Sequence, residues 1–268
     1  MTLPLARPLA YGDYPFVQPV RAGTGSIPTL DSPVSGAILH PQRVPLFDDL
    51  RILDCATFDA SRLHPEVRRF YETPHRRMTV AALRWERWAL GLALAYVPVA
   101  ARLENLRVPD RVNTPTPMSS SVRRLTWPDG TSSREWIRCV AGTSQLFYVA
   151  ALRPWSDGER SYLSMAFPFG PGHLMVLLRT REEAGELVVS TRDDSLAGTY
   201  AIIPRERAFV AFPGPPTDET LRATATTDGV AVVHEGHLGA RRTFTMRYGI
   251  RGGRTVTAPH PETAGSPA

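Results

Sequence analysis

Ten short segments rich in β-branched and aromatic residues follow one another through the C-terminal two-thirds of the chain, separated by tight turns. The turns include PDG at 128–130 and DG at 157–158 and 228–229, sequences typical of hairpin connections. Linkers this short make neighbouring strands antiparallel, because a parallel pair needs a crossover of about a dozen residues or more. The predicted strands are 122–127, 134–140, 145–152, 161–167, 174–180, 186–191, 200–204, 221–226, 230–238 and 241–250.

Ten antiparallel strands leave two unpaired edges unless the sheet curls or closes. We therefore predict a mainly β fold, a closed or half-closed antiparallel β-barrel of the lipocalin type. A β-sandwich is the alternative. The strand at 174–180 is apolar on both faces near its middle, so we expect it to be covered on both sides. The N-terminal arm or a helix would cover it outside, and a ligand or packed core inside.

The chain has 268 residues, of which 43% are hydrophobic, enough for one sizeable core. Residues 1–50 carry many prolines together with scattered apolar anchors, and we predict an arm that wraps over the core. Residues 51–258 are predicted to form a single domain, a helical lead followed by the barrel. The polar residues 259–268 are predicted to be a disordered tail.

Two helices are predicted in the lead. The first spans about 65–74, where Pro65 suits the first helical position and Val67, Phe70 and Tyr71 form one apolar face. The second spans about 87–103 and contains an apolar run. A membrane span needs about 20 apolar residues, so we interpret this shorter run as a buried or interfacial helix.

The N-terminus lacks the unbroken apolar stretch of a secretory signal, and the chain has only two cysteines. These features predict a cytoplasmic protein with reduced thiols. All 31 basic residues are arginines, and they are spread along the chain. Arginine-rich groups at 62–87 and 241–254 lack the spaced aromatic residues of a base-stacking surface, so we predict no nucleic-acid partner. The sequence sets no oligomeric state.

The predicted strands hold more aromatic and methionine side chains than a narrow core requires. We interpret the surplus as the lining of an apolar cavity for a hydrophobic small molecule. Tyr148, His173 and Glu235 are the candidate catalytic residues, because such groups in a dry cavity can polarise a carbonyl or transfer a proton. The predicted ligand-binding residues are Trp136, Tyr162, Met165, Phe167, Met175, Tyr200, Phe244, Met246 and Tyr248.

Other chemistries have little support. His234 and His237 form an HxxH pair, but residues three apart on a strand point to opposite faces and cannot share a metal ion. Ser195 lacks a GxSxG context, and the glycine patterns GTG and GPG do not open helices. We therefore predict no metal and no cofactor.

Three stretches carry a resemblance: HPEVRRFYE, REWIRCVAGTSQLFYVAAL and YLSMAFPFGPGHLMVLLR. Over about 60–250 the chain resembles a group of largely uncharacterised actinobacterial proteins that combine a short helical lead with a lipocalin-like β region. The resemblance implies no set of catalytic residues. It implies a role in secondary metabolism, and a looser likeness is to the cofactor-free β-barrel cyclases of natural-product biosynthesis.

Three functions are open at this point. The first is a cofactor-free cyclase or isomerase, in which the barrel holds a hydrophobic, polyketide-like substrate in a reactive conformation. The second is a non-catalytic carrier of a lipid or pigment. The third is an interaction protein that uses its basic surface.

Overall fold

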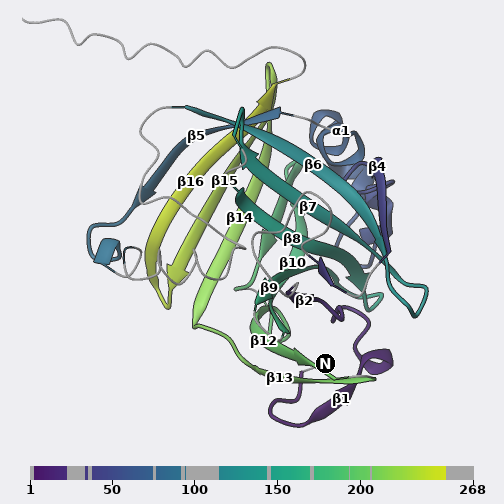
Figure 1. Cartoon of the computed structure of the whole chain (residues 1–268). Coiled ribbons are helices and arrows are strands. Elements are labelled where there is room, and N and C mark those ends of the chain that lie inside the picture. The colour runs from purple at the N-terminus through teal and green to yellow at the C-terminus, as the bar shows by residue number, and fades with distance from the viewer. Residues whose placement is uncertain are drawn as a thin grey trace, which may run out of the picture.

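The computed structural model shows a large antiparallel sheet that closes on itself as a barrel (Figure 1). The structure describes residues 3–22, 34–35, 38–74, 77–91, 94, 115–143, 146–169, 172–192, 194–205 and 207–251. The barrel strands, given in their order around it, are β5 (Arg77–Trp85), β6 (Thr116–Thr126), β7 (Ser132–Val140), β8 (Leu146–Ser156), β9 (Ser161–Phe169), β10 (Gly172–Glu183), β11 (Glu186–Ser190), β14 (Thr217–Thr226), β15 (Gly229–Leu238) and β16 (Arg241–Arg251).

The pairing of β16 with β5 joins the two ends of this order, and every pair in it is antiparallel. The closed ten-stranded barrel confirms the lipocalin-like prediction, and the sandwich alternative is set aside. Closure removes the edges that a strand series of this length would otherwise expose. Nine of the ten predicted strands belong to the barrel, and β5 takes the place of the tenth.

Strand alternation separates an inner face from an outer face. Directly paired residues share a face, so the partners Leu152, Met165 and Val176 form one row across β8, β9 and β10. All of these are buried in the main hydrophobic cluster, which contains the inner-face residues of every barrel strand. The inner wall of the barrel is therefore largely apolar.

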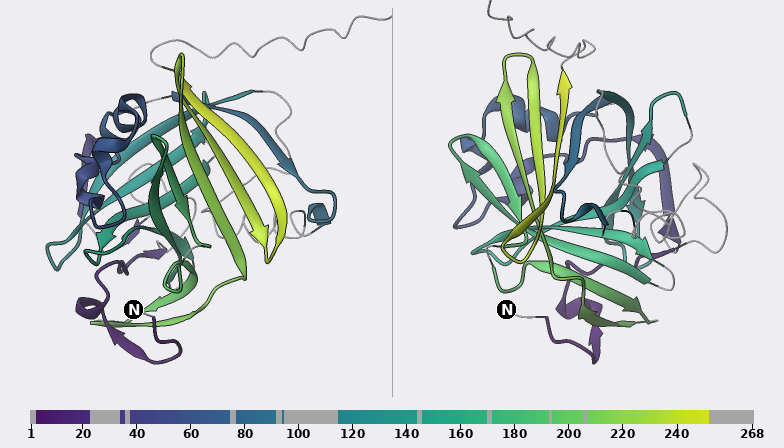
Figure 2. Two further views of the ribbon diagram at one scale, coloured as in Figure 1. Left: turned by 180° about the vertical axis from the view of Figure 1, so that it is seen from behind. Right: turned by 90° about the vertical axis from the view of Figure 1, so that its left-hand side faces the viewer.

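Residues 44–72, here called the end cap, close one end of the barrel (Figure 2). The end cap contains η2 (Leu50–Leu53), η3 (Ala60–Arg62) and α1 (Pro65–Glu72). Its apolar side chains, among them Phe47 and Phe70, belong to the same cluster as the inner wall. Backbone amides of the cap reach the turns after β8 and β10: Ala56 N–H donates to Gly158 O at 3.2 Å, and His64 N–H to Gly185 O at 2.9 Å.

Helix α1 forms where its sequence predicts it. Pro65 occupies the first turn, Nδ1 of His64 accepts the Glu66 amide, and Val67, Phe70 and Tyr71 are buried.

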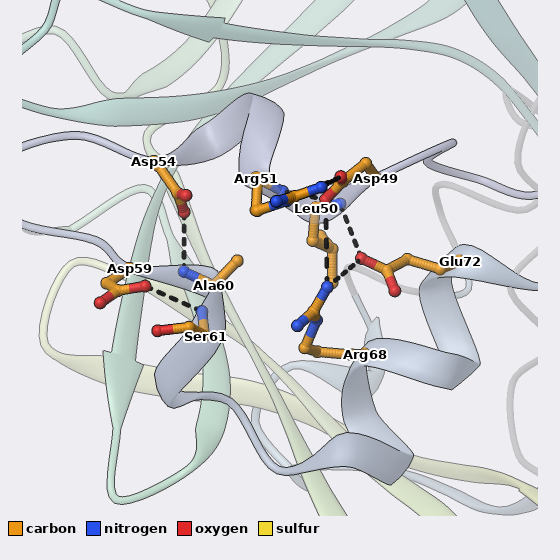
Figure 3. A network of polar contacts seen from close by, with 9 residues as sticks. All are labelled: Asp49, Leu50, Arg51, Asp54, Asp59, Ala60, Ser61, Arg68 and Glu72. Carbon is orange, nitrogen blue, oxygen red and sulfur yellow. Dashed lines mark hydrogen bonds and ion pairs between the residues drawn. The ribbon is translucent and has the colours of Figure 1, made fainter.

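Hydrogen bonds and ion pairs join the segments of the end cap to one another (Figure 3). Glu72 accepts the Leu50 amide at 2.9 Å and pairs with Arg68 at 3.2 Å. Asp54 accepts the Ala60 amide at 2.7 Å. The predicted domain boundary at residue 50 falls inside η2, within this network.

Residues 3–22, here called the N-terminal strap, lie outside the barrel. They contain β1 (Pro8–Ala10), η1 (Tyr11–Asp13) and β2 (Arg21–Ala22), and β2 pairs with β3 (Val34–Ser35). Phe16 and Val17 are buried in a second cluster with Met175 and Leu177 of β10. The strap thus covers the outer face of β10. Cover on that face is what the two apolar faces of this strand predict.

Among the described residues, three strands extend the sheet beyond β10. β12 (Gly198–Pro204) pairs with the first half of β10, while β11 pairs with its second half. β13 (Ala208–Pro213) then pairs with β12, and β1 pairs with β13 (Figure 1). β4 (Ile38–Arg43) is a separate addition along β6.

Three strand and helix predictions need correction or lie beyond the structure. The strand predicted at 200–204 is β12, which is outside the barrel, and β13 was not predicted, because its short apolar segment runs into PGPP. β6 begins at Thr116 rather than 122. The helix predicted over 87–103 falls mostly outside the described residues, of which 90, 91 and 94 are helical. The predicted tail 259–268 also lies outside them.

No helix among the described residues combines the length and the apolar character that crossing a membrane requires.

Candidate functional site

The structure divides the predicted ligand-binding residues between the two faces of the sheet. Six belong to the main cluster on the inner face, namely Trp136, Met165, Phe167, Phe244, Met246 and Tyr248. Tyr162, Met175 and Tyr200 belong instead to the outer cluster beneath or beside the N-terminal strap. The Tyr162 hydroxyl donates to Asp194 at 3.0 Å, and that of Tyr200 to Leu196 O at 2.6 Å. These three residues therefore hold the outer layer together and do not line the interior.

The predicted catalytic residues are not brought together. His173 lies on the outer face of β10 under the strap, with Nδ1 3.0 Å from Val20 O. Burial lowers the pKa of His173 to about 4. Glu235 lies on the outer face of β15, where Arg242 pairs with it at 3.1 Å. The cavity hypothesis requires catalytic residues that face the interior, and neither His173 nor Glu235 does so. Tyr148 is paired with Arg138 in the register, and its side chain lies outside the described residues.

A histidine and a carboxylate that were not predicted as a pair meet on the inner face. His234 Nε2 lies 3.2 Å from Glu219 Oε2, and the two side chains are only 16% and 26% exposed. Register explains the contact. Leu221, His234, Met246 and Leu83 are partners in one row, and Glu219 starts the next row. His234 and Glu219 are thus diagonal neighbours across the β14–β15 hairpin.

Aromatic rings border this pair. The Phe244 ring lies 5.1 Å from His234 in an edge contact, and Trp85 lies 5.1 Å from Phe244. Both aromatic side chains are only partly buried against the main cluster. The position is at the barrel end that carries the β15–β16 turn, opposite the end cap, because successive strands reverse direction. Other half-buried apolar residues of the inner face near this end are Val140, Leu174 and Leu221, the last paired with His234.

Gly236 makes room for Phe244. A Cβ at position 236 would lie 2.1 Å from Cε1 of the Phe244 ring, so the ring rests directly on the backbone of β15. We expect Gly236→Ala to displace this ring and to lower the free energy of unfolding by about 1–3 kcal/mol, the usual cost of overpacking. Urea unfolding checks the loss. Gly239→Ala is not a suitable control, because its φ of +57° adds strain, whereas Gly91, with nothing within 4 Å, is suitable. An unchanged midpoint for Gly236→Ala would contradict the packing argument.

A second polar group lies deeper in the barrel. Arg138 is 4% exposed, and its guanidinium stacks 3.7 Å from the Trp136 ring centre and 4.8 Å from that of Tyr248. Trp136 donates its indole N–H to Ser120 at 2.9 Å. Burial raises the pKa of Tyr71 in the end cap. The nearby Tyr248 raises it further, and the positive charge of Arg138 lowers it. The aromatic faces stabilise the buried cation within a largely apolar wall.

No group of three or more potential metal ligands occurs among the described residues. His234 and His237 lie on opposite faces of β15, as strand alternation predicts, so the HxxH pair does not chelate.

Comparison of the chain with protein-family models, with curated proteins and with solved structures finds no significant match. The fold and the site therefore define the class of protein: a closed antiparallel β-barrel with an apolar inner wall, capped at one end and bearing a His–Glu pair among aromatic residues at the other.

Proposed function

We propose that the barrel binds a hydrophobic small molecule against its inner wall. The observation that carries the proposal is the position of the half-buried apolar residues. Four of them, Trp85, Val140, Leu174 and Phe244, gather at the end opposite the cap, and Leu221 lies beside His234. The remaining ones, Val44, Cys55 and Ala225, lie in the cap or next to it. A small-molecule site is typically apolar with a few placed polar groups, and barrel mouths are a common position for one. His234, Glu219 and Arg138 would supply those polar groups.

Within this function, we propose a cofactor-free isomerase or cyclase acting on a polyketide-like substrate in natural-product biosynthesis, in the cytoplasm. The His234–Glu219 pair favours catalysis over simple carriage, because a carrier of a lipid or pigment needs no acid–base group beside its aromatic residues. The resemblance to actinobacterial proteins and to barrel cyclases supports the same function. A non-catalytic carrier is the alternative.

The binding experiment uses the full chain and the fluorescent probe 8-anilinonaphthalene-1-sulfonate, together with native mass spectrometry to detect a co-purified organic molecule. We expect one saturable probe site. Phe244→Ala should weaken probe binding about tenfold, the equivalent of about 1.4 kcal/mol of lost contact.

Phe212→Ala is the matched control, since Phe212 is a 41% exposed phenylalanine of β13 outside the barrel. It should leave the probe affinity unchanged. Absence of a saturable site, or equal losses in the two variants, would overturn the binding proposal.

A further inference from the structure

His234 and Glu219 have the geometry of an oriented base. The imidazole Nε2 and the carboxylate Oε2 are 3.2 Å apart, and Glu219 is the hydrogen-bond partner of His234 among the described residues. A carboxylate only accepts hydrogen bonds, so in the neutral imidazole it selects the tautomer with the proton on Nε2. Nδ1 is then left with its lone pair, the atom that takes a proton from a reacting group.

The surroundings suit a substrate that is mostly apolar. His234 lies in a row with Leu221 and Met246, and its ring contacts Phe244 edge-on. The side chain is 16% exposed, so it is screened from most water but is not sealed in the core. The other acid–base groups of β15, Glu235 and His237, face away from the interior.

We propose that His234, oriented by Glu219, is the general base that moves a proton from the α to the γ carbon of a hydrophobic β,γ-unsaturated carbonyl compound held in the barrel. This inference rests on the proposed binding function and names its substrate class. Nδ1 takes the proton from the carbon next to the carbonyl. The C–H electron pair becomes the C=C bond of the enolate, and the carbonyl π pair moves to oxygen.

The substrate carries a C=C bond between its β and γ carbons, so the enolate is a dienolate. The pair on oxygen re-forms the carbonyl, the enolate C=C pair becomes the α,β double bond, and the former β,γ pair takes the same proton from Nδ1 at the γ carbon. No oxidant or reductant is consumed. Between the two steps His234 is an imidazolium, and the Glu219 carboxylate stabilises that charge at hydrogen-bond distance. The pair therefore catalyses an isomerisation without a cofactor.

The test uses 5-nitrobenzisoxazole, an apolar aromatic probe of base strength. A base removes its ring C–H proton, the C–H pair forms a nitrile as the N–O bond breaks, and a coloured phenolate is released. We expect the full chain to accelerate this reaction over free imidazole at equal concentration and pH. His234→Gln should lower the rate about 100-fold, the low end of a general-base contribution.

Two variants on the opposite face of the same strand are matched controls. His237→Gln and Glu235→Gln change the same residue types outside the interior and should keep the wild-type rate. Glu219→Gln should lower the rate about tenfold and shift the His234 tautomer populations in a long-range ¹H–¹⁵N spectrum, because its amide no longer selects one tautomer. A purely structural role for Glu219 would leave the tautomers unchanged.

The inference is overturned if wild-type protein gives no acceleration, or if His234→Gln reacts as fast as His237→Gln. Binding of the anilinonaphthalene probe is measured on the same samples, so the two proposals fail separately. Saturable binding without acceleration removes the base and leaves the binding function. Loss of saturable binding in the wild type removes the binding function itself.

Discussion

Replacing Arg123 by leucine should lower the free energy of unfolding by about 3–5 kcal/mol, since it leaves a buried charge without its partner. Arg123 and Glu135 are direct partners on β6 and β7, and the Glu135 side chain is 0% exposed. The guanidinium donates to Glu135 Oε2 from Nε at 2.9 Å and lies 2.6 Å away through Nη2. Urea unfolding at pH 7 measures the loss.

The neighbouring Arg124 is the matched control. It pairs with Asp48 at 3.2 Å, but the two side chains are 44% and 61% exposed. Arg124→Leu should therefore cost about 0–1 kcal/mol, as exposed pairs generally do. The double variant Arg123→Leu/Glu135→Leu should recover most of the stability lost by the single variant, because no buried charge remains. Equal losses in the single and double variants would show that shape, not charge, sets the cost.

Lowering the pH should also reduce the difference in the free energy of unfolding between wild type and Arg123→Leu. Burial raises the pKa of Glu135, and Arg123 opposes that rise. Without Arg123 the pKa in the folded state moves further above the value of the unfolded chain. The folded state then takes up the proton first as the pH falls, so acid favours folding of the variant relative to its stability at pH 7. A deficit that is the same at pH 7 and pH 5 would contradict this account.

The barrel was predictable because its information is local. Turns such as Asp228-Gly229 fix hairpins, and many successive hairpins demand closure. The strand predicted at 200–204 exists as β12, but its place outside the barrel was not predictable in this way. β10 is long enough to pair with β12 along one half and with β11 along the other, and no local pattern marks that division.

The sequence was a weaker guide to which side chains of each strand point into the barrel. Alternation shows that two faces exist, but on β10 both are apolar, so it does not show which one is inside. The register between β9 and β10 shows which residues of the two strands share a face. The observed register pairs Leu174 with Phe167, which puts His173 and Met175 on the other face. The same reasoning applied to the β14–β15 hairpin would have placed Glu219 diagonal to His234.

The burial of His173 by the N-terminal strap could not be predicted from local sequence patterns. The strap residues that bury it are about 150 positions earlier in the chain, as the contact with Val20 shows. Contacts between positions so distant depend on the completed fold, so proline-rich sequence alone indicated an arm but not the residues beneath it.

That buried histidine should make the protein sensitive to mild acid. The pKa of His173 is lowered from 6.5 to about 4 by burial, which its hydrogen bond to Val20 only partly offsets. Well above pH 6.5 the residue is neutral in both the folded and the unfolded state, so its full contribution to the free energy of unfolding is present. As the pH falls from 6.5 to about 4, the unfolded chain takes up the proton and the folded protein does not, so stability is lost. A difference of about 2.5 pH units corresponds to about 3 kcal/mol.

His173→Asn isolates this contribution, because an asparagine amide can still donate to Val20 O but does not titrate in this range. The variant should lose about 3 kcal/mol less than wild type between pH 7 and pH 4 in urea unfolding. Nε2 of His173 is buried and has no hydrogen-bond partner among the residues that the structure describes, so its protonation places a charged N–H under the N-terminal strap. The hydrogen-exchange protection factors of the strap amides, which allow for the slower intrinsic exchange in acid, should therefore fall at pH 4 in wild type and much less in the variant. Parallel pH profiles for the two proteins would show that His173 is not the group responsible.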